Sequence, residues 1–523
     1  MMKTFNTAGT CRPNEHYMVD ITDRLETIRK MVVKGDYFCI NRGRQYGKTT
    51  TLANLKGYLE QFGYCVFSIS FEKVDSSYFQ TQSTLGAIIL RLLALCVKRN
   101  KTNHLDTVCA EEVLSFQNTH STECSIFDMS EFLIQLCGNN SHPIVLLIDE
   151  VDQASAHESF LKFLGALRDM YLNRGDDPAF QSVILAGVYD IKNLKIKIRT
   201  EEDHQYNSPW NIAVPFEVDM SLSPEGIAGM LAEYKTDHEL TFDENEVAQM
   251  IHDYTSGYPF LVSRICQKIE QEKWTWNKEG VQKAANAILM ERNTLFDNMI
   301  KKLDDYPELK KLLKGILFEG KKKPYSPDEK YIQIATMFNY IVNKDGYVAI
   351  ACRLMETRLY NLFINEDGDE LLMMQGQADK NQFIHDGSID MPHLMERFVI
   401  HMNQTFDLDK DHQFLEDNGR EIFLTYLRPI INGVGNYYIE AQTRDHNRMD
   451  VIVDYLGTQY VIELKIWRGN AYNERGEEQL CRYLEYYDLQ TGFLVSFCFN
   501  KKMKSGLLPP VKLKGRTLIE AIV

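Results

Sequence analysis

The fold is decided by residues 38–50, which read Phe38-Cys39-Ile40-Asn41-Arg42-Gly43-Arg44-Gln45-Tyr46-Gly47-Lys48-Thr49-Thr50. An apolar strand pattern enters a glycine-containing turn that ends in Gly-Lys-Thr, and a helical pattern of leucines follows. This order predicts a phosphate-binding loop, because backbone N–H groups of the turn and helix start point at the phosphates. Lys48 would bind the β- and γ-phosphates of ATP, and the Thr49 hydroxyl would hold Mg²⁺.

The residues predicted to bind the nucleotide lie in this turn and at the helix start: Gly43, Gln45, Tyr46, Gly47, Lys48, Thr49 and Thr50. The pattern G-x-x-x-x-G-K-[ST] departs at its first glycine, where the chain has Arg42. Either the turn is reshaped, or Gly43 takes part of that role. Arg42 and Arg44 either add charge near the phosphates or face solvent. A chance Gly-Lys-Thr in a surface turn is the alternative, and the strand and helix around it favour the nucleotide site.

Length, charge and cysteine content limit the classes of protein. At 523 residues, the chain has room for about two to four domains. The net charge of −15 argues against attraction of nucleic acid by the whole molecule, so DNA would need a local basic patch. Lysine clusters at 310–323 and 501–516 are candidates, although solvated surface is the simpler interpretation. The eleven cysteines form no C-x-x-C pair, which favours reduced thiols over disulfides or a zinc finger.

The sequence shows no membrane signature. Its first sixteen residues are polar and lack the apolar core of a signal peptide, and no apolar run is long enough to span a bilayer. We therefore expect a cytoplasmic protein without a membrane partner.

Acidic residues end the next strongly apolar run. Residues 143–150 read Pro143-Ile144-Val145-Leu146-Leu147-Ile148-Asp149-Glu150. Five apolar residues predict a strand buried on both faces of a parallel sheet, with the carboxylates at the end where ligands bind. Asp149 would hold Mg²⁺, and Glu150 would orient or deprotonate the attacking water. A buried strand that happens to end in two acids is the alternative.

Alternating strand and helix patterns predict an α/β fold with a parallel sheet across residues 1–220. Residues 182–189 resemble a further buried strand, and its end offers polar candidates for sensing the γ-phosphate: Tyr189, Asp190 and Asn193. Helical patterns across 221–364 predict a lid, within which Arg264 either reaches the nucleotide or lies on the surface. A helix–strand–helix pattern near 331–363 is compatible with a winged helix. We interpret the acidic stretch 365–390 as a linker.

Residues 391–523 carry a second cluster of charged residues. Residues 449–455 and 460–466 read as two strands joined at Leu456-Gly457-Thr458-Gln459. Pairing 456 with 459 would set Asp450 opposite Lys465 and residue 452 opposite Glu463, so that Asp450, Glu463 and Lys465 share one face.

Two carboxylates and a lysine on one face suit metal-assisted phosphodiester cleavage. The carboxylates would hold Mg²⁺ or Mn²⁺, and Lys465 would position water or stabilise the transition state. Gln479 and Tyr483, one helical turn apart, would brace the site, while Glu421 and Glu440 are further candidate ligands. A solvent-facing charged face on a hairpin is the alternative.

Two family resemblances follow from these motifs. The N-terminal half resembles the AAA-ATPase-like proteins of bacteria, through Tyr17-Met18-Val19-Asp20, the loop at 42–49, Leu147-Ile148-Asp149-Glu150 and Gly257-Tyr258-Pro259. The C-terminal part is similar to the PD-(D/E)XK nuclease superfamily, through Arg448-Met449-Asp450, Ile462-Glu463-Leu464-Lys465 and Gln479-Leu480-Cys481-Arg482-Tyr483. The resemblance implies a restriction-endonuclease-like α/β domain with a triad of Asp450, Glu463 and Lys465. It gives Glu421 the role of an acid from a helix.

Two hypotheses from different classes remain. The first is an ATP- and Mg²⁺-dependent nuclease acting on DNA or another nucleic acid, with defence or mobile-element biology as its setting. The second is a nucleotide-dependent switch whose C-terminal domain binds without cutting. Relatives of such ATPases form rings, so a homo-oligomer is a possible state that the sequence does not test.

Overall fold

The computed structural model describes residues 3–99, 101–188, 210–317, 323–367, 382–385, 388–405, 412–431, 435–440, 450–455, 458–467, 477–478, 480–481, 483–485, 488–498 and 504–523. The chain divides into two compact units. Unit 1 comprises Met1–Glu239, Tyr258–Ser263 and Met337–Asn339, and unit 2 comprises Leu240–Gly257, Arg264–Thr336 and Tyr340–Val523.

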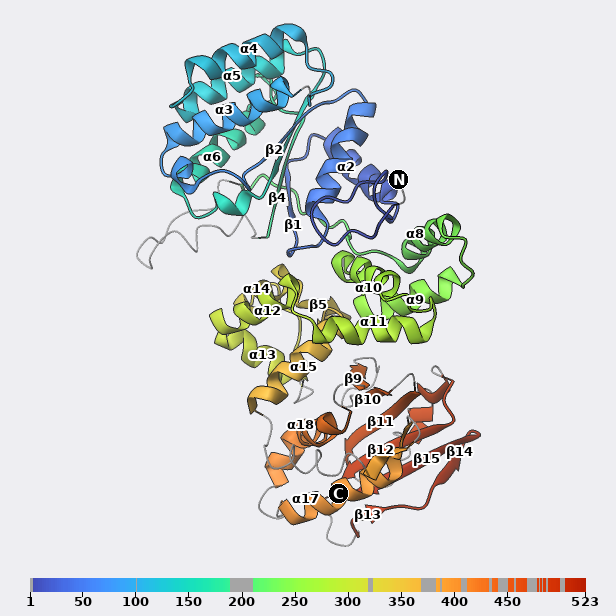
Figure 1. Ribbon diagram of the computed structural model, residues 1–523. Helices are drawn as coiled ribbons and strands as arrows, with labels where there is room; N and C mark the ends of the chain where they lie inside the picture. The colour runs from blue at the N-terminus through green and yellow to red at the C-terminus, as the bar shows by residue number, and fades with distance from the viewer. Residues whose placement is uncertain are drawn as a thin grey trace. The chain divides into compact units, whose positions relative to one another are not determined.

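A parallel four-stranded sheet in the order β1-β4-β3-β2 forms the centre of unit 1 (Figure 1). Its strands are β1 (Phe38–Asn41), β2 (Cys65–Ser70), β3 (Ile144–Asp149) and β4 (Ser182–Gly187). Every residue of β3 and β4 is buried, as expected for parallel strands covered on both faces. The predicted α/β fold with a parallel sheet is confirmed.

Helices cover both faces of this sheet. Helices α1 (Thr22–Val33) and α2 (Lys48–Gln61) pack on one face. The opposite face carries α3 (Gln82–Lys98), α4 (Thr107–Thr119), α5 (Ile126–Asn139) and α6 (Glu158–Leu172). Alternate residues of the strands supply the two cores, so that Val145 and Leu147 face α2 while Leu146 and Ile148 face α3 to α6.

The predicted helical region begins with α8 (Pro224–Asp237) in unit 1. Ser223 caps it, because its Oγ accepts a hydrogen bond from the N–H of Gly226 (3.1 Å). The helices that follow are α9 (Glu244–Thr255), α10 (Pro259–Gln271), α11 (Lys278–Met290), α12 (Thr294–Asp305) and α13 (Pro307–Leu317).

The predicted helix–strand–helix pattern is wrong in one respect, because two strands replace the single one. Helix α14 (Lys330–Met337) leads into an antiparallel hairpin of β5 (Ile341–Lys344) and β6 (Tyr347–Ile350), followed by α15 (Arg353–Asp367). The turn places Asp345 at φ 53° and Gly346 at φ 84°. Two successive positive φ values suit a tight hairpin turn, so the residues before it fold back as a strand.

Unit 2 ends in a seven-stranded mixed sheet. Before it lie a short hairpin, β7 (Ile384–His385) and β8 (Ser388–Ile389), and the helices α17 (Met391–Thr405) and α18 (His412–Ile431). The stretch expected to be a linker thus starts within α15 and contains this hairpin. The sheet has the order β13-β15-β12-β11-β10-β9, with β14 beside β15. Its strands are β9 (Gly435–Glu440), β10 (Asp450–Tyr455), β11 (Thr458–Ile466), β12 (Thr491–Phe497), β13 (Gly506–Leu507), β14 (Val511–Leu513) and β15 (Arg516–Ile522).

The register of β10 on β11 corrects the predicted pairing. Asp450 lies opposite Glu463, rather than Lys465, and Tyr455 pairs with Thr458. Only residues 456 and 457 remain between the strands, so Thr458 belongs to β11 instead of the turn. The shift is two residues, which preserves the alternation of faces. Asp450, Glu463 and Lys465 therefore still occupy one face of the sheet, as predicted.

Candidate functional site

The turn at residues 42–49 lies between β1 and α2, at the carboxyl end of the parallel sheet. Gln45 and Gly47 adopt left-handed backbone conformations, with φ values of 58° and 81°. Left-handed residues turn successive N–H groups toward a common centre, which creates a cavity for an anion. Lys48 then begins α2, so the N–H groups at the N-terminus of α2 face the same turn.

Lys48 is folded back onto this loop. Its Nζ donates hydrogen bonds to the carbonyl oxygens of Arg42 and Gly43, both at 3.0 Å. The residue is only 6% exposed. Burial lowers the pKa of Lys48, and the carboxylates of Glu150, Asp152 and Asp149 act in the opposite direction. The three acids thus partly offset the cost of burying the lysine charge.

The acids at the end of β3 meet the start of α2. Thr49 Oγ1 donates to Asp149 Oδ2 at 2.8 Å, and the other oxygen of Asp149 accepts from the N–H of Glu150 at 2.9 Å. Burial, together with the neighbouring Asp149, raises the pKa of Glu150. A hydroxyl and a carboxylate in contact are suitable Mg²⁺ ligands, and a carboxylate with a raised pKa is suited to accept a proton.

Asp152 is a third acid that the sequence reading did not single out. Its Oδ2 accepts a hydrogen bond from the N–H of Val188 at 2.6 Å. This contact fastens the end of β4 to the turn after β3. The pair Asp149-Glu150 fits the pattern of acids at the end of a buried strand, whereas Asp152 stands two residues further on. Its closeness to the pair in the sequence was the signal that could have identified it. The proposed sensors at 189, 190 and 193 lie outside the described residues.

Arg42 turns away from the loop. Its Nη2 donates to the carbonyl of Val218 at 3.0 Å, and its guanidinium lies over the ring of Phe216, 5.5 Å from the centroid. Burial lowers the pKa of Arg42. Arg44, in contrast, is exposed. Arg42 thus attaches the segment at 216–218 to the loop, an arrangement that neither sequence interpretation included.

An aromatic pair supports the loop from the start of α10. Tyr258 donates from its hydroxyl to the carbonyl of Arg44 at 2.6 Å. Its ring meets that of Tyr46 edge to face, with centroids 4.7 Å apart. Pro259 Cγ lies 3.9 Å from the position that a Cβ on Gly47 would take. Tyr258 therefore fixes the backbone of the loop, a role that no local sequence signal reveals.

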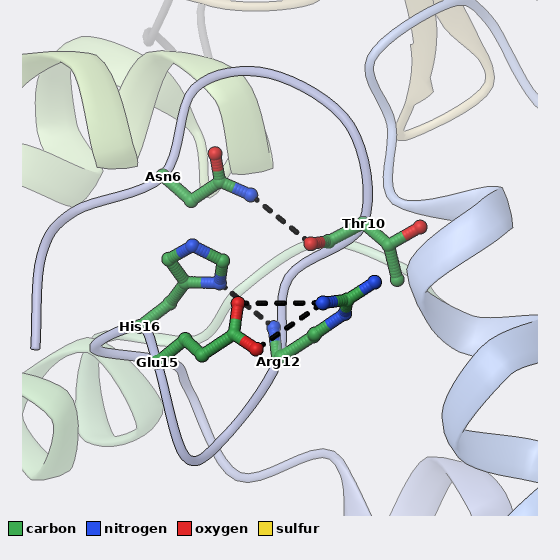
Figure 2. Close-up of polar contacts among 5 residues, drawn as sticks. All are labelled: Asn6, Thr10, Arg12, Glu15 and His16. Atoms are coloured by element: carbon green, nitrogen blue, oxygen red, sulfur yellow. Dashed lines mark hydrogen bonds and ion pairs between the residues drawn. The ribbon is translucent and has the colours of Figure 1, made fainter.

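The N-terminal segment also reaches α2. The N–H of Cys11 donates to Thr50 Oγ1 at 3.0 Å. Figure 2 shows the contacts that close this segment on itself: Asn6 Nδ2 donates to the Thr10 carbonyl at 3.2 Å, and Arg12 pairs with Glu15 at 3.1 Å. The backbone N–H of Arg12 donates to His16 Nδ1 at 2.9 Å. Thr50, predicted to bind nucleotide, thus has its hydroxyl engaged by the N-terminal segment.

One protein family, described as the AAA-like domain, matches residues 12–361. The chain belongs to this family. The match includes the phosphate loop, the acids at the end of β3 and the Tyr258 contact. A comparison with curated proteins finds no match.

The AAA-like chain is also similar to solved structures. The Walker-type ATPase PABY2304 of Pyrococcus abyssi has a TM-score of 0.47 and 14% identity, and the match covers 68% of this chain and 99% of that one. The ORC2 protein of Aeropyrum pernix, in its ADPNP–ADP complexes, has a TM-score of 0.36 and 12% identity over 69% of this chain and 97% of that one. The A. pernix ORC1 protein in complex with DNA has a TM-score of 0.30 and 13% identity over 67% and 94%.

The predicted C-terminal cluster lies beyond the matched residues, on the sheet of unit 2. Glu463 is fully buried, and Lys465 is 5% exposed. Lys465 Nζ lies 3.5 Å from Glu520 Oε1 on β15, and Ser496 on β12 donates to the same oxygen. Residues Leu480, Cys481 and Leu484 pack on the neighbouring positions of this face. Glu520 is thus a further acid beside Lys465, which its distance in the sequence concealed.

The remaining predicted residues lie partly within and partly outside the described part of the chain. The backbone of Asp450 and Glu440 is paired in β10 and β9, while their side chains are outside the described part. Gln479 is likewise outside it. Glu421 lies on α18, whose Gly419 approaches the Phe497 ring, on the opposite face from Glu463. Its role as a ligand stays a prediction.

Arg264 has partners within unit 2. Its Nε donates to Glu291 Oε1 at 2.9 Å, and its Nη1 donates to Gln267 at 2.6 Å. Its predicted contact with nucleotide stays a prediction. Among the described side chains, no group of three or more His, Cys, Asp and Glu residues is arranged to hold a metal ion. In the same part of the chain, no helix has the length and apolar character that crossing a bilayer requires.

Proposed function

We propose that the AAA-like domain binds and hydrolyses ATP with Mg²⁺. The observation that carries this proposal is the meeting of Lys48, Thr49 and Asp149 at one turn. Lys48 would exchange the loop carbonyls for phosphate oxygens, and Thr49 with Asp149 would hold Mg²⁺. The ion supplies neutralisation of the charge that develops on the transferred phosphoryl group. Glu150, with its raised pKa, would accept a proton from the attacking water.

Hydrolysis is tested by measuring phosphate release from MgATP by the full chain and two variants. Lys48→Ala should abolish binding and turnover. Lys56 cannot serve as its control, because it is partly buried and pairs with Glu60. Lys344→Ala, on the exposed side of β5, is a suitable control and should behave as the unaltered protein. Turnover that survives Lys48→Ala would contradict the proposal.

We further propose that the C-terminal domain is a Mg²⁺-dependent nuclease acting on nucleic acid, with DNA as the first substrate to test. Asp450 lies opposite Glu463, and Lys465 follows two residues later on the same face. A fully buried carboxylate is unfavourable unless a cation compensates it, and both Lys465 and a divalent metal are suitable. The carboxylates would hold the metal, which supplies Lewis acidity, and Lys465 would stabilise negative charge on phosphate.

The order of elements supports this second proposal. Helix α18 precedes three antiparallel strands, β9 to β11, and residues 480–485 are helical where described. Strand β12 then lies parallel to β11. A helix before the hairpin and a helical segment after it are the positions in which the resemblance implies Glu421 and the Gln479 motif.

A binding domain that does not cut is the second candidate function. The contact of Lys465 with Glu520 favours it, because a lysine engaged by another carboxylate is less available to a substrate. The net charge of −15 points the same way.

Incubation with circular and linear DNA and Mg²⁺ or Mn²⁺, with and without ATP, separates the two candidates. Cutting that is lost in Lys465→Ala and retained in Lys512→Ala, an exposed lysine on β14, would support the nuclease. No cutting under any of these conditions, with intact ATP turnover, would support the nucleotide-dependent switch.

A further inference from the structure

A segment distant in the sequence lies against the phosphate loop. Gly43 is buried in the loop, and a Cβ at this position would come within 2.7 Å of Asn339 Nδ2 and 3.0 Å of the Phe338 carbonyl oxygen. The first distance is shorter than real Cβ contacts, and the second, to backbone, is tighter than most of them. Residues 337–339 belong to the same compact unit as the loop. The glycine that stands one position after the expected one is therefore required by this close approach.

The side-chain amide of Asn339 is a buried donor at this contact. Its Nδ2 has no hydrogen-bond partner among the described residues. A buried donor without an acceptor destabilises the folded protein. An acceptor that becomes available to it in another state of the protein would therefore stabilise that state. Gly43 of the phosphate loop lies against this amide.

Lys48 now supplies a donor to carbonyl oxygens of the loop, each of which can also accept a second hydrogen bond. Its Nζ bonds to Arg42 O and Gly43 O. When Lys48 turns to the phosphates of a nucleotide, these carbonyls lose their donor while they remain in a buried loop. The exchange would leave the carbonyl oxygens of Arg42 and Gly43 without the lysine donor. The Asn339 amide, which has no acceptor in the described part of the chain, lies against the same loop.

We infer that Asn339 is a nucleotide-sensing positioning residue, whose amide binds the carbonyls of the phosphate loop once Lys48 has turned to nucleotide. The inference rests on the proposed binding of ATP. Asn339 lies in the turn that follows α14 (Lys330–Met337), so the hydrogen bond would fix the backbone of this turn only when nucleotide is present.

Asn339 could instead serve only as the left-handed residue that ends a helix, and experiment separates this role from nucleotide sensing. Asn339 has φ 56°, and the N–H of Tyr340 bonds to Ala335 O at 2.8 Å, as at a helix end with a left-handed residue. Glycine suits that position at least as well as asparagine. Asn339→Gly therefore keeps the helix end and removes the amide. Asn339→Asp keeps the shape of the side chain and removes the donor.

The experiment measures MgATP affinity by calorimetry and amide hydrogen exchange of residues 338–344, with and without MgATP, on the full chain. Both variants should bind MgATP roughly fivefold more weakly or worse, the size of one hydrogen bond. Nucleotide should slow exchange at 338–344 in the unaltered protein and in Lys344→Ala, and should have no such effect in either variant. A purely structural role would change thermal stability without removing this response.

Three results would overturn the inference. Asn339→Gly that binds MgATP as tightly as the unaltered protein would exclude a role for the amide. Exchange at 338–344 that does not respond to MgATP in the unaltered protein would exclude sensing. No binding of MgATP by the unaltered chain would overturn the proposed function together with this inference, whereas the first two results leave ATP binding intact.

A reciprocal variant tests the contact itself. Gly43→Ala should weaken MgATP binding, because its methyl group would displace Asn339 and the Phe338 carbonyl. Combined with Asn339→Gly, it should weaken binding by less than the product of the two separate effects. If the double variant weakens MgATP binding by the full product of the two separate effects, the two positions act independently and the inference is overturned.

Discussion

The hydroxyl of Tyr254 on α9 donates a hydrogen bond to Oδ2 of Asp454 on β10, and the two oxygens are 3.0 Å apart. Gln282 Nε2 on α11 donates to the other carboxylate oxygen, also at 3.0 Å. Asp454 is 3% exposed. Helices from the matched AAA-like residues thus bind a strand of the sheet that lies beyond the match, and one buried carboxylate accepts both of these hydrogen bonds.

This link should make the stability of unit 2 depend on pH. Burial raises the pKa of Asp454 from 3.8 to about 6, against hydrogen bonds from Tyr254 and Gln459. Between these values the folded protein keeps a proton that the unfolded chain has released. The free energy of unfolding should therefore fall as pH rises from about 4 to about 6 and level off above. Asp454→Asn should lack this fall, while Asp454→Ala should lose about 1–3 kcal/mol because two buried donors lose their acceptor.

Urea denaturation followed by tryptophan fluorescence, at about pH 5 and about pH 7.5, measures this dependence. The difference between the two pH values should be smaller in Asp454→Asn than in the unaltered protein. Asp304→Asn, an exposed position on α12, is the control. An identical pH response in Asp454→Asn and the unaltered protein would contradict the prediction.

Local sequence patterns predicted the parts of this protein that depend on local burial. The apolar runs at β3 and β4 predicted fully buried strands because parallel strands are covered on both faces. The alternation in β10 and β11 placed Asp450 and Glu463 on one face even though the predicted register was two residues off. Alternation fixes the face of a strand, whereas the turn fixes the register.

Such local patterns did not predict contacts between segments that are distant in the sequence. Tyr258 bonds to Arg44 and Asn339 lies against Gly43, more than two hundred positions apart in each case. The sequence predicts Arg42 either near the phosphates or in solvent, yet its side chain binds the carbonyl of Val218. Each of these contacts depends on how the chain returns to the loop, which residue type and spacing alone do not encode.

Glu150→Gln should separate binding of ATP from its hydrolysis. Glutamine keeps the size of the side chain and cannot accept the proton of the attacking water, so turnover should fall about 100-fold or more. Affinity for MgATP should remain within a few fold, since Lys48 and Thr49 are unchanged. Phosphate release and calorimetry measure the two quantities. Glu158→Gln, an exposed position at the start of α6, is the control, and unchanged turnover in Glu150→Gln would exclude the proposed role.

Arg42→Gly restores the usual glycine of the phosphate-loop pattern and should nevertheless destabilise unit 1. The variant loses the bond to the Val218 carbonyl and the contact with Phe216, and it adds a flexible residue. We expect a loss of about 1–2 kcal/mol without tighter binding of MgATP. Chemical denaturation and nucleotide titration check both points. Arg44→Gly adds the same backbone freedom at an exposed position and should change stability less. Tighter MgATP binding by Arg42→Gly would show that the arginine acts on the nucleotide instead.

Glu520→Gln should destabilise unit 2 through Lys465. The glutamine amide can still accept from Ser496, so the loss falls on the ion pair with the buried lysine. Removal of one partner leaves the other charge less compensated, and we expect a loss of about 1–3 kcal/mol of unfolding free energy. Lys465→Met should also destabilise the unit.

The double variant of Lys465 and Glu520 shows whether the interaction between them contributes to the free energy of unfolding. With both charges removed, no lysine is left without its partner, so Lys465→Met with Glu520→Gln should lose less than the sum of the single losses. Lys512→Met, on the exposed face of β14, should combine additively with Glu520→Gln. If Lys465 and Glu520 also combine additively, Lys465 draws its compensation from another group of the face, and Glu463, two residues before it on β11, becomes the next position to vary.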